Sequence, residues 1–325
     1  MPELPEVETV RRSLDALVVG KTIGNVEVRL PRLIRTPGDV GRFQTQLAGC
    51  RIEAVERRGK YLIFRVPPYR LISHLRMEGQ YRLHQAGEPE GPHTHIIFHF
   101  TDGTELRYRD VRQFGTMDLI AEGDAMPKGV ASLGPEPFAD ELDGAGLYRR
   151  IHRRRAPIKA VLLDQTCLAG LGNIYVDEAL FLARIHPEQV AAKVTRRQAN
   201  ELLTAIRGVL RRAIDAGGSS VSTYVDGYGR HGGFQVELNV YAREGEPCRV
   251  CQTPIEKTRV GGRGTHYCPL CQRPPRTSRR SSTARGKSRP SFYGRANGLD
   301  ARQTTDEEDG RLAAGDDHAG QGVGA

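Results

Sequence analysis

The spacing of apolar residues changes along the chain and divides it into segments. Near the start, apolar residues recur at helical spacing up to Gly20, which predicts an amphipathic helix. They are Val7, Val10, Leu14 and Leu17. Between residues 23 and 120, short apolar runs such as 61–66 and 96–100 are separated by turn-forming Pro, Gly and Asp residues. This part is predicted to form a β-sandwich or barrel, with a helix at its start.

The next part of the chain has a helical period. A linker rich in Gly, Pro and acidic residues is predicted over 121–137, and apolar positions from about 138 to 216 repeat at helical spacing. Residues 195–198 have the form of a capping box, and the apolar face that follows ends at Gly217. Two shorter helical runs flank the sequence GLGN at 170–173. Such a turn either exposes N–H groups to a phosphate or makes a tight corner between helices.

Four of the six cysteines have the spacing of a metal site. They fall as Cys248-x2-Cys251-x16-Cys268-x2-Cys271. This spacing is typical of a structural zinc ribbon, and without a secretory signal it favours metal over disulfides. One Zn²⁺ is therefore predicted, without His266, because four thiolates already complete a tetrahedron. The glycines at 261–264 lie where a two-stranded ribbon would turn, which places Arg263 at its tip.

The charge balance indicates a polyanionic partner. The formal net charge is +9 and the pI is about 9.4. Residues 276–325 hold nine Lys/Arg and seven Asp/Glu, so removing their +2 leaves +7 on residues 1–275. Their composition, first Arg/Ser-rich and then acidic, predicts a disordered tail. No apolar run approaches the ~18 residues of a membrane span, so a cytoplasmic protein without a membrane partner is expected.

The first residues carry candidate catalytic chemistry. If Met1 is removed, Pro2 has a free secondary amine, which titrates near pH 8 and can act as a nucleophile. Secondary amines form iminium ions with sugar aldehyde carbons, and Glu3 and Glu6 supply carboxylates within one turn. On its own, however, the segment is more simply interpreted as the acidic start of a helix.

Three motifs together resemble one family. PELPEVET at the start, GLGNIY in the helical part and GGRGTHYC in the ribbon are similar to bacterial formamidopyrimidine-DNA glycosylases, in that family's order and over residues 2–272. The resemblance implies an α+β protein that acts as a monomer on damaged double-stranded DNA, near the nucleoid. The expected parts are an N-terminal β-sandwich with flanking helices (2–120), a linker (121–137), a helix–two-turn–helix domain with a lesion-covering loop (138–240), a C-terminal β-hairpin zinc finger (241–275) and the tail (276–325).

The resemblance also implies catalytic roles. Pro2 would attack C1′ of the damaged nucleotide, and Glu3 would protonate the sugar ring oxygen and later move protons. Glu6 matches a second acidic position near the pocket. Lys60 matches a lysine that contacts the phosphate next to the lesion.

Other residues match DNA-contacting positions of the family. Met77, Arg112 and Phe114 match three residues that fill the space left by an everted base. The family often has Asp-Pro-Arg-Arg-Phe where this chain has Val111 and Gln113, but Arg112 and Phe114 remain. The resemblance further implies DNA-backbone contacts by Lys159, Asn173, Tyr241 and Arg263. The loop 217–234 corresponds to the element that covers the damaged base.

The function implied by the resemblance is bifunctional DNA repair. The enzyme would excise oxidised purines (8-oxoguanine and formamidopyrimidines) through a Schiff base on Pro2, then cleave the abasic strand by β- and δ-elimination. Two alternatives remain open. One is an endonuclease VIII-like glycosylase for oxidised pyrimidines. The other is a non-catalytic, zinc-dependent DNA-binding protein, which would leave Pro2 and Glu3 unexplained.

Overall fold

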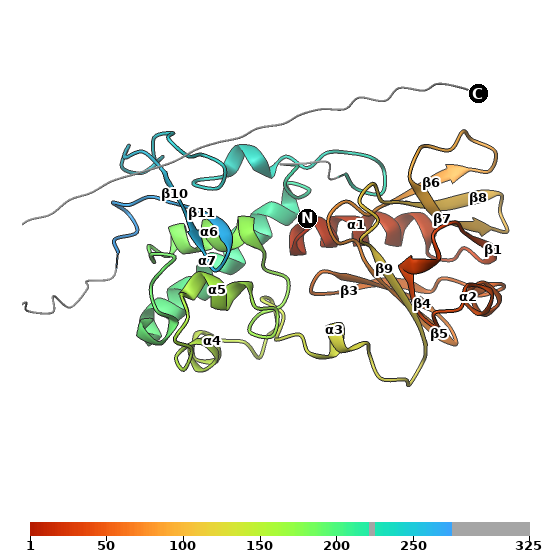
Figure 1. The fold of residues 1–325 in the computed structure, drawn as a ribbon, viewed down its shortest axis with the longest axis horizontal. Helices are drawn as coiled ribbons and strands as arrows, with labels where there is room; N and C mark the ends of the chain where they lie inside the picture. Colours follow the sequence, from red (N-terminus) through yellow and green to blue (C-terminus); the bar gives the residue numbers. More distant parts are fainter. Residues whose placement is uncertain (221–224, 275–325) are drawn as a thin grey trace, which may run out of the picture. The chain divides into compact units, whose positions relative to one another are not determined.

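The computed structural model describes residues 1–220 and 225–274 of the chain (Figure 1). The described residues all belong to one structural unit. The predicted tail, 276–325, lies outside the described residues, as do residues 221–224 of the predicted lesion-covering loop. Within the described part, no helix is long and apolar enough to cross a membrane.

The N-terminal segment forms the predicted β-sandwich. One sheet has the order β1 (Ile23–Val28), β7 (Thr94–Phe100), β8 (Thr104–Arg109) and β6 (Gln80–Gln85). The other has the order β2 (Ile34–Thr36), β9 (Thr116–Ala121), β5 (Tyr69–His74), β4 (Tyr61–Val66) and β3 (Ala54–Arg58). Neighbouring strands are antiparallel except for the β2–β9 pair. The flanking helical elements are α1 (Leu4–Val18), η1 (Pro31–Leu33) and α2 (Val40–Leu47).

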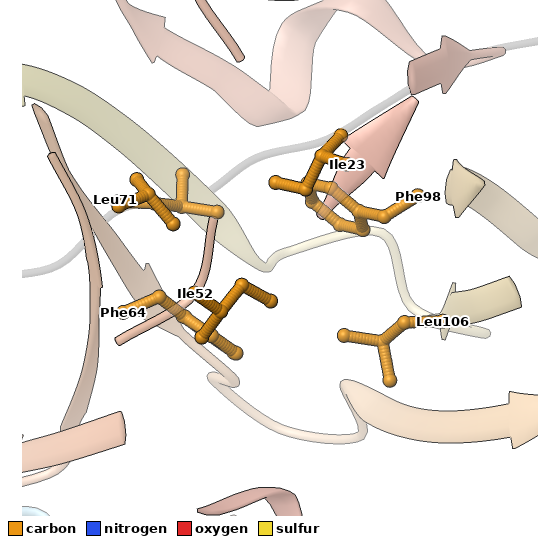
Figure 2. A pocket seen from close by; sticks show the side chains of 7 residues that line it. Ile23, Ile52, Phe64, Leu71, Phe98 and Leu106 are labelled. Carbon is orange, nitrogen blue, oxygen red and sulfur yellow. The ribbon is translucent and has the colours of Figure 1, made fainter. Parts of the chain in front are cut away.

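Apolar side chains from both sheets fill the space between them. Figure 2 shows Phe64 and Leu71 of one sheet on the opposite side of a narrow gap from Phe98 and Leu106 of the other. The residues around this gap are all apolar, so it belongs to the core and offers a ligand no polar contact. The buried face of α1 packs on the same cluster of residues, as its helical spacing predicts.

The helical region follows the predicted linker, which itself contains a short helix, α3 (Lys128–Ala131). The other helices are α4 (Gly144–Ile151), α5 (Ile158–Leu163), α6 (Asn173–Leu182), η2 (Ala191–Lys193) and α7 (Arg196–Asp215). The predicted capping box starts α7, because Thr195 and Gln198 bond to each other's backbone N–H groups. Leu4 packs in the core of this region rather than in the sandwich. The N-terminus therefore lies between the strands and the helices (Figure 1).

The last described elements are η3 (Phe234–Glu237) and a hairpin of β10 (Glu256–Val260) and β11 (Arg263–Tyr267). Gly261 and Gly262 form the turn of the hairpin, with φ of +57° and +78°. Glycine adopts positive φ without steric cost, which suits the tight turns that join two twisted strands. Arg263 is thus the first residue after the turn, close to the predicted tip.

Candidate active site and zinc centre

Directly after the exposed Met1, the chain is buried where α1 meets α6. Pro2 is buried, and Glu3 is 3% exposed. Leu4 donates its backbone N–H to the carbonyl of Gly170, at 3.0 Å. Gly172 lies so close to Glu3 that a Cβ there would be 2.2 Å from the carboxylate carbon. In this structure the Glu3 side chain therefore packs directly against the GLGN turn. The turn is thus part of the site and more than a tight corner between two helices.

The Glu3 carboxylate lies at the N-terminus of α6. It accepts hydrogen bonds from the backbone N–H groups of Ile174 (3.0 Å) and Tyr175 (3.4 Å). Burial raises the pKa of Glu3 to about 7; the Glu6 charge adds to this effect, and Lys60 opposes it. At neutral pH the carboxyl group is therefore close to half protonated. A group with that pKa can both donate and accept a proton in a reaction.

Glu6 connects three separate elements. Its Oε2 accepts the N–H of Glu3 at 2.8 Å, and its Oε1 accepts the hydroxyl of Tyr175 at 2.5 Å and the N–H of Ser219 at 2.8 Å. The side chain is buried, and the residue is only 2% exposed. Sequence reasoning placed Glu6 near the pocket but missed Tyr175 and Ser219. The contacts join residues more than 160 positions apart, and no local pattern reports such contacts.

Lys60 occupies the turn between β3 and β4 and is 6% exposed. Burial lowers the pKa of Lys60, whereas the nearby Glu3 and Glu6 carboxylates raise it. The turn is held by Glu136 of the linker, whose Oε1 accepts the N–H of Gly59 at 2.6 Å. Two arginines of β3 also bond to this carboxylate: Arg57 at 2.8 Å and Arg58 at 3.0 Å. The sequence predicts Glu136 only as part of a linker. The residues around it give no sign that its carboxylate holds the turn between β3 and β4.

The three predicted base-replacing residues are not part of the core. Phe114 is 53% exposed, and Arg112 is exposed with its guanidinium 5.1 Å from the centre of the Phe114 ring. Met77 is half-buried. The loop that carries Arg112 and Phe114 is fastened by the buried Asp110, which accepts the N–H groups of Arg112 and Gly115. Gln113, at the departure from the family pattern, adopts a φ of +56°.

A buried ion pair fastens the β10–β11 hairpin to the helices. Lys159 is 0% exposed and donates to Asp177 at 2.6 Å and to the carbonyl of Gly264 at 2.9 Å. Asn173 donates to the same carbonyl at 3.0 Å, and Asp177 accepts the N–H of His266 at 2.9 Å. These bonds fix β11 and so the exposed Arg263 at its start. The direct DNA contact of Lys159 stays a prediction, because its amine is engaged in this network.

Glu178 holds the segment that leads into the zinc ribbon. Its carboxylate accepts the backbone N–H groups of Asn239, Val240 and Tyr241 at distances of 2.8–3.0 Å, and the residue is 0% exposed. The ring of Tyr241 packs edge-on against His266, with centroids 5.2 Å apart. Sequence reasoning missed Asp177 and Glu178. Two adjacent acids in an apolar helix were the available signal, because buried charges require partners.

The four predicted cysteines form a cluster that fits zinc. Their ligand atoms lie within 4.8 Å of one another, with Sγ–Sγ distances of 3.4 Å for Cys251–Cys268, 3.5 Å for Cys251–Cys271 and 3.9 Å for Cys248–Cys271. A tetrahedron of thiolates with Zn–S bonds of ~2.3 Å has edges of ~3.8 Å. His266 faces Tyr241 and Asp177 instead. The ribbon thus holds one structural Zn²⁺ with a complete set of ligands.

Comparisons with known proteins agree with this arrangement. Residues 1–117 match the formamidopyrimidine-DNA glycosylase N-terminal domain, residues 133–225 match the H2TH domain of the same enzymes, and residues 245–274 match the zinc finger found in FPG and IleRS. A formamidopyrimidine-DNA glycosylase of Halalkalibacterium halodurans is 53% identical over 274 residues, which cover 84% of this chain and 100% of that one. One from Bacillus cereus is 52% identical over 273 residues, covering 84% and 99%.

Solved structures give the same result. A Lactococcus lactis FPG variant in complex with Fapy-dG-containing DNA has a TM-score of 0.79 and 43% identity, and the match covers 84% of this chain and 100% of that chain. The Lactococcus lactis enzyme in complex with DNA containing an abasic site has the same TM-score, identity and coverage. With three family domains in order and relatives matched along their whole length, the chain belongs to the formamidopyrimidine-DNA glycosylase family.

Proposed function

We propose that this protein excises oxidised purines from duplex DNA and then cleaves the strand at the abasic site. The observation that carries the proposal is a buried Glu3, with a pKa of about 7, next to a proline that becomes N-terminal when Met1 is removed. The relatives are formamidopyrimidine-DNA glycosylases, and the similar Lactococcus lactis structures contain DNA with Fapy-dG or an abasic site. This context favours oxidised purines over oxidised pyrimidines as the substrate.

In the proposed reaction, the unprotonated Pro2 amine attacks C1′ of the damaged nucleotide. The base leaves with the electron pair of the glycosidic bond and takes up the proton that the attacking amine loses. Glu3 donates its proton to the sugar ring oxygen as the bond between C1′ and that oxygen breaks. The opened sugar is then bound to Pro2 as an iminium ion. Loss of a proton from C2′ eliminates the 3′ phosphate, and a second elimination releases the 5′ phosphate. Glu3 can carry protons through both stages because its two protonation states are similarly populated near pH 7.

The remaining predicted residues would hold the DNA. Lys60, Asn173, Tyr241 and Arg263 would contact phosphates around the lesion, which fixes the position of the strand without reading its sequence. Met77, Arg112 and Phe114 would enter the stack where the damaged nucleotide leaves it. Support comes from the exposure of Arg112, Phe114 and Arg263. The structural Zn²⁺ would act only through the ribbon that carries Arg263.

We also propose the domain boundaries given by the sequence pattern, at 120, 137, 240 and 275. The buried apolar clusters and the family matches support this division. Action on chromosomal DNA would place the protein in the cytoplasm, at the nucleoid.

A panel of duplexes tests the proposed function. The duplexes carry 8-oxoguanine, a formamidopyrimidine, an oxidised pyrimidine, an abasic site or no lesion. We expect fast cleavage at both purine lesions and at the abasic site, with phosphates left on both sides of the gap. Preferred cleavage at the oxidised pyrimidine would instead support the endonuclease VIII-like alternative. Tight binding without cleavage would support the non-catalytic alternative.

A further inference from the structure

A group of exposed cations lies where the end of α4, the connection to α5, η2 and the start of α7 meet. We call it the basic patch, and its members are Arg149, Arg150, Arg153, Arg154, Arg155, Lys193, Arg196 and Arg197. Direct contacts hold these segments together. Ala192 of η2 donates its N–H to the carbonyl of Arg154 at 2.9 Å. The guanidinium of Arg196 lies 5.5 Å from the centre of the Tyr148 ring on α4, which stacks on His152.

Most cations of the basic patch have no counter-charge in the described part of the chain. Arg154 pairs with Asp164 at 3.3 Å, and Arg197 pairs with Glu201 at 2.9 Å. No carboxylate of the described residues lies within 4.0 Å of the other six cations. The eight cations and these two carboxylates together carry +6, whereas all of residues 1–275 carry +7. The rest of that part of the chain is therefore close to neutral, at +1.

This concentration of positive charge opposes folding, because like charges repel one another. Arg196 and Arg197 also lie in the first turn of α7, where the helix dipole disfavours cations. Within the described residues, only the two ion pairs and the contact of Arg196 with the Tyr148 ring offset the repulsion. A bound polyanion would remove most of what is left.

The chemistry of the basic patch fits the phosphates of a DNA backbone. Seven of its eight cations are arginines, whose guanidinium can form two parallel hydrogen bonds to one phosphate. A small anion can neutralise only one or two of the six unpaired charges. Duplex DNA can neutralise them all, since it carries one negative charge per ~1.7 Å of its axis. Under the proposed function, duplex DNA is also the polyanion that this protein meets.

The basic patch is separate from the proposed lesion site. In the described part of the chain, none of its side chains bonds to Glu3, Lys60 or Arg263, and its two ion pairs run to other carboxylates. We propose that the basic patch binds phosphates of duplex DNA outside the lesion site. The inference rests on the proposed function only for the identity of the polyanion. The phosphates belong either to the flank of the duplex that holds the lesion or to a second duplex, and in both cases the contact adds affinity for DNA of any sequence.

A DNA titration of the triple variant Arg150→Gln, Arg153→Gln, Arg155→Gln tests the proposal. The probe is an undamaged duplex of roughly 40 base pairs, titrated at several salt concentrations. A plot of log association constant against log salt concentration should become shallower by about 0.9 for each lost phosphate contact, or about 2.7 in total. The affinity at ~0.1 M salt should fall about tenfold or more.

The matched control removes three exposed cations elsewhere, in the triple variant Arg42→Gln, Lys128→Gln, Arg212→Gln. These side chains also have no ion pair within the described residues, so the two variants change the net charge equally. The control should weaken DNA binding by less than about threefold, because isolated surface charges are screened by salt. Excision of 8-oxoguanine at saturating enzyme should separate affinity from chemistry: the rate in the patch variant should stay within about threefold of the wild type.

Two further titrations identify the source of the phosphates. In the first, the protein is saturated with an abasic-site duplex of about 12 base pairs, and a labelled undamaged duplex is then added. A ternary complex that forms with the wild type and is lost in the patch variant identifies a second duplex. In the other titration, short and long abasic-site duplexes are compared. Tighter binding of the long duplex by the wild type alone identifies the flank of the lesion-containing duplex.

Unchanged affinity and salt dependence in a folded patch variant would overturn the proposal in favour of an acidic protein as partner. Equal losses in the patch variant and the control would also overturn it. If circular dichroism shows that the patch variant is unfolded, Arg149→Gln with Lys193→Gln should reproduce the effect, with a plot shallower by about 1.8. A wild type that shows this DNA binding yet excises no 8-oxoguanine contradicts only the proposed function.

Discussion

At the scale of single residues, burial of charge determines the chemistry. Glu3 and Lys60 are both almost fully buried. Burial raises the pKa of Glu3 and lowers the pKa of Lys60, which in each case favours the neutral form of the side chain. For Glu3 the result is a pKa of about 7, which suits a group that donates and accepts protons at neutral pH. The sequence shows that an acid follows Pro2. It could not show this pKa, because the pKa depends on how the fold buries the carboxyl group against the N-terminus of α6.

The pKa of Glu3 predicts the pH dependence of base excision. Glu3 donates a proton only while it is protonated, which slows excision as the pH rises through about 7, whereas the Pro2 amine attacks only while it is unprotonated, which slows excision as the pH falls below about 8. The excision rate should therefore pass through a maximum between about pH 7 and 8. Glu3→Gln removes the proton donor and should lower excision by roughly 100- to 10,000-fold with little change in lesion binding. Single-turnover rates between pH 5.5 and 9 measure both effects. Near-normal excision by Glu3→Gln would mean that another group is the acid.

The same pKa predicts how stability depends on pH. The pKa is about 7 in the folded protein against an ordinary value of 4.5, so the folded state binds the proton more tightly. The contribution of Glu3 to stability is therefore fully present below pH 4.5 and is lost as the pH rises through about 7. The loss is on the order of 3 kcal/mol. Urea unfolding at pH 5 and pH 8 should show this loss in the wild type, and a much smaller one in Glu3→Gln.

Phe114 gives a third prediction at this scale. Because its side chain is 53% exposed, Phe114→Ala should lower the free energy of unfolding by less than about 1 kcal/mol. Excision from a duplex should nevertheless slow by tenfold or more, because the variant loses part of the compensation for unstacking. A single-stranded abasic substrate should be cleaved at the wild-type rate. Destabilisation of about 3 kcal/mol or more would instead show that Phe114 belongs to the core.

At the scale of elements, the local sequence pattern predicts which helices and turns form. Contacts between distant segments determine where each of these elements lies in the fold. The capping box of α7 and the glycine turn of β10–β11 were predicted from the sequence, since each depends on residues only a few positions apart. The contact of Glu136 with the β3–β4 turn and that of Glu6 with Tyr175 join distant segments. Lys159 shows the same limit: the resemblance matches it to a DNA-contacting lysine, and only the fold shows that it lies within α5, buried beside Asp177.

The buried Lys159–Asp177 ion pair predicts that removing the Asp177 charge lowers the free energy of unfolding and loosens the β10–β11 hairpin. Asp177→Asn leaves a buried lysine without its counter-charge, which typically costs about 3–5 kcal/mol of unfolding free energy. Binding to abasic-site DNA should weaken because β11 and Arg263 are held less firmly, while the zinc content should stay at one ion. The matched control is Glu201→Gln, which breaks an exposed pair with Arg197 and should cost less than about 0.5 kcal/mol. Equal effects of the two substitutions in urea unfolding and DNA titration would contradict the predicted role of the buried pair.

At the scale of the whole molecule, two apolar cores meet around one short N-terminal segment. Val7 packs in the sandwich core, whereas Leu4 packs in the helical core. The segment that carries Pro2 and Glu3 is therefore held from both sides. Neither motif spacing nor composition could predict this division of α1 between two cores, because the same helical period fits burial against either one.

Zinc removal should affect the molecule unevenly. The ribbon's core is small, since Val240, Ile255 and two of the cysteines pack only against Phe181 of α6, so loss of the metal should unfold it. The sandwich and helical cores should remain folded, and DNA binding should fail first because Arg263 is displaced. Chelation followed by circular dichroism and a DNA titration measures this order. Retained DNA affinity in protein with less than about half an equivalent of zinc would contradict the prediction.

The central claim is that the amine of Pro2 forms the covalent bond to the damaged sugar. Borohydride trapping on an 8-oxoguanine duplex tests it most directly, with wild-type protein lacking Met1 compared with protein that carries one extra residue before Pro2. We predict that the wild type forms a reduced crosslink, which peptide mapping places on Pro2. The extended protein should bind the duplex yet form no crosslink and cleave no strand. Trapping and strand cleavage by the extended protein, or a crosslink mapped to a lysine such as Lys60, would contradict the claim.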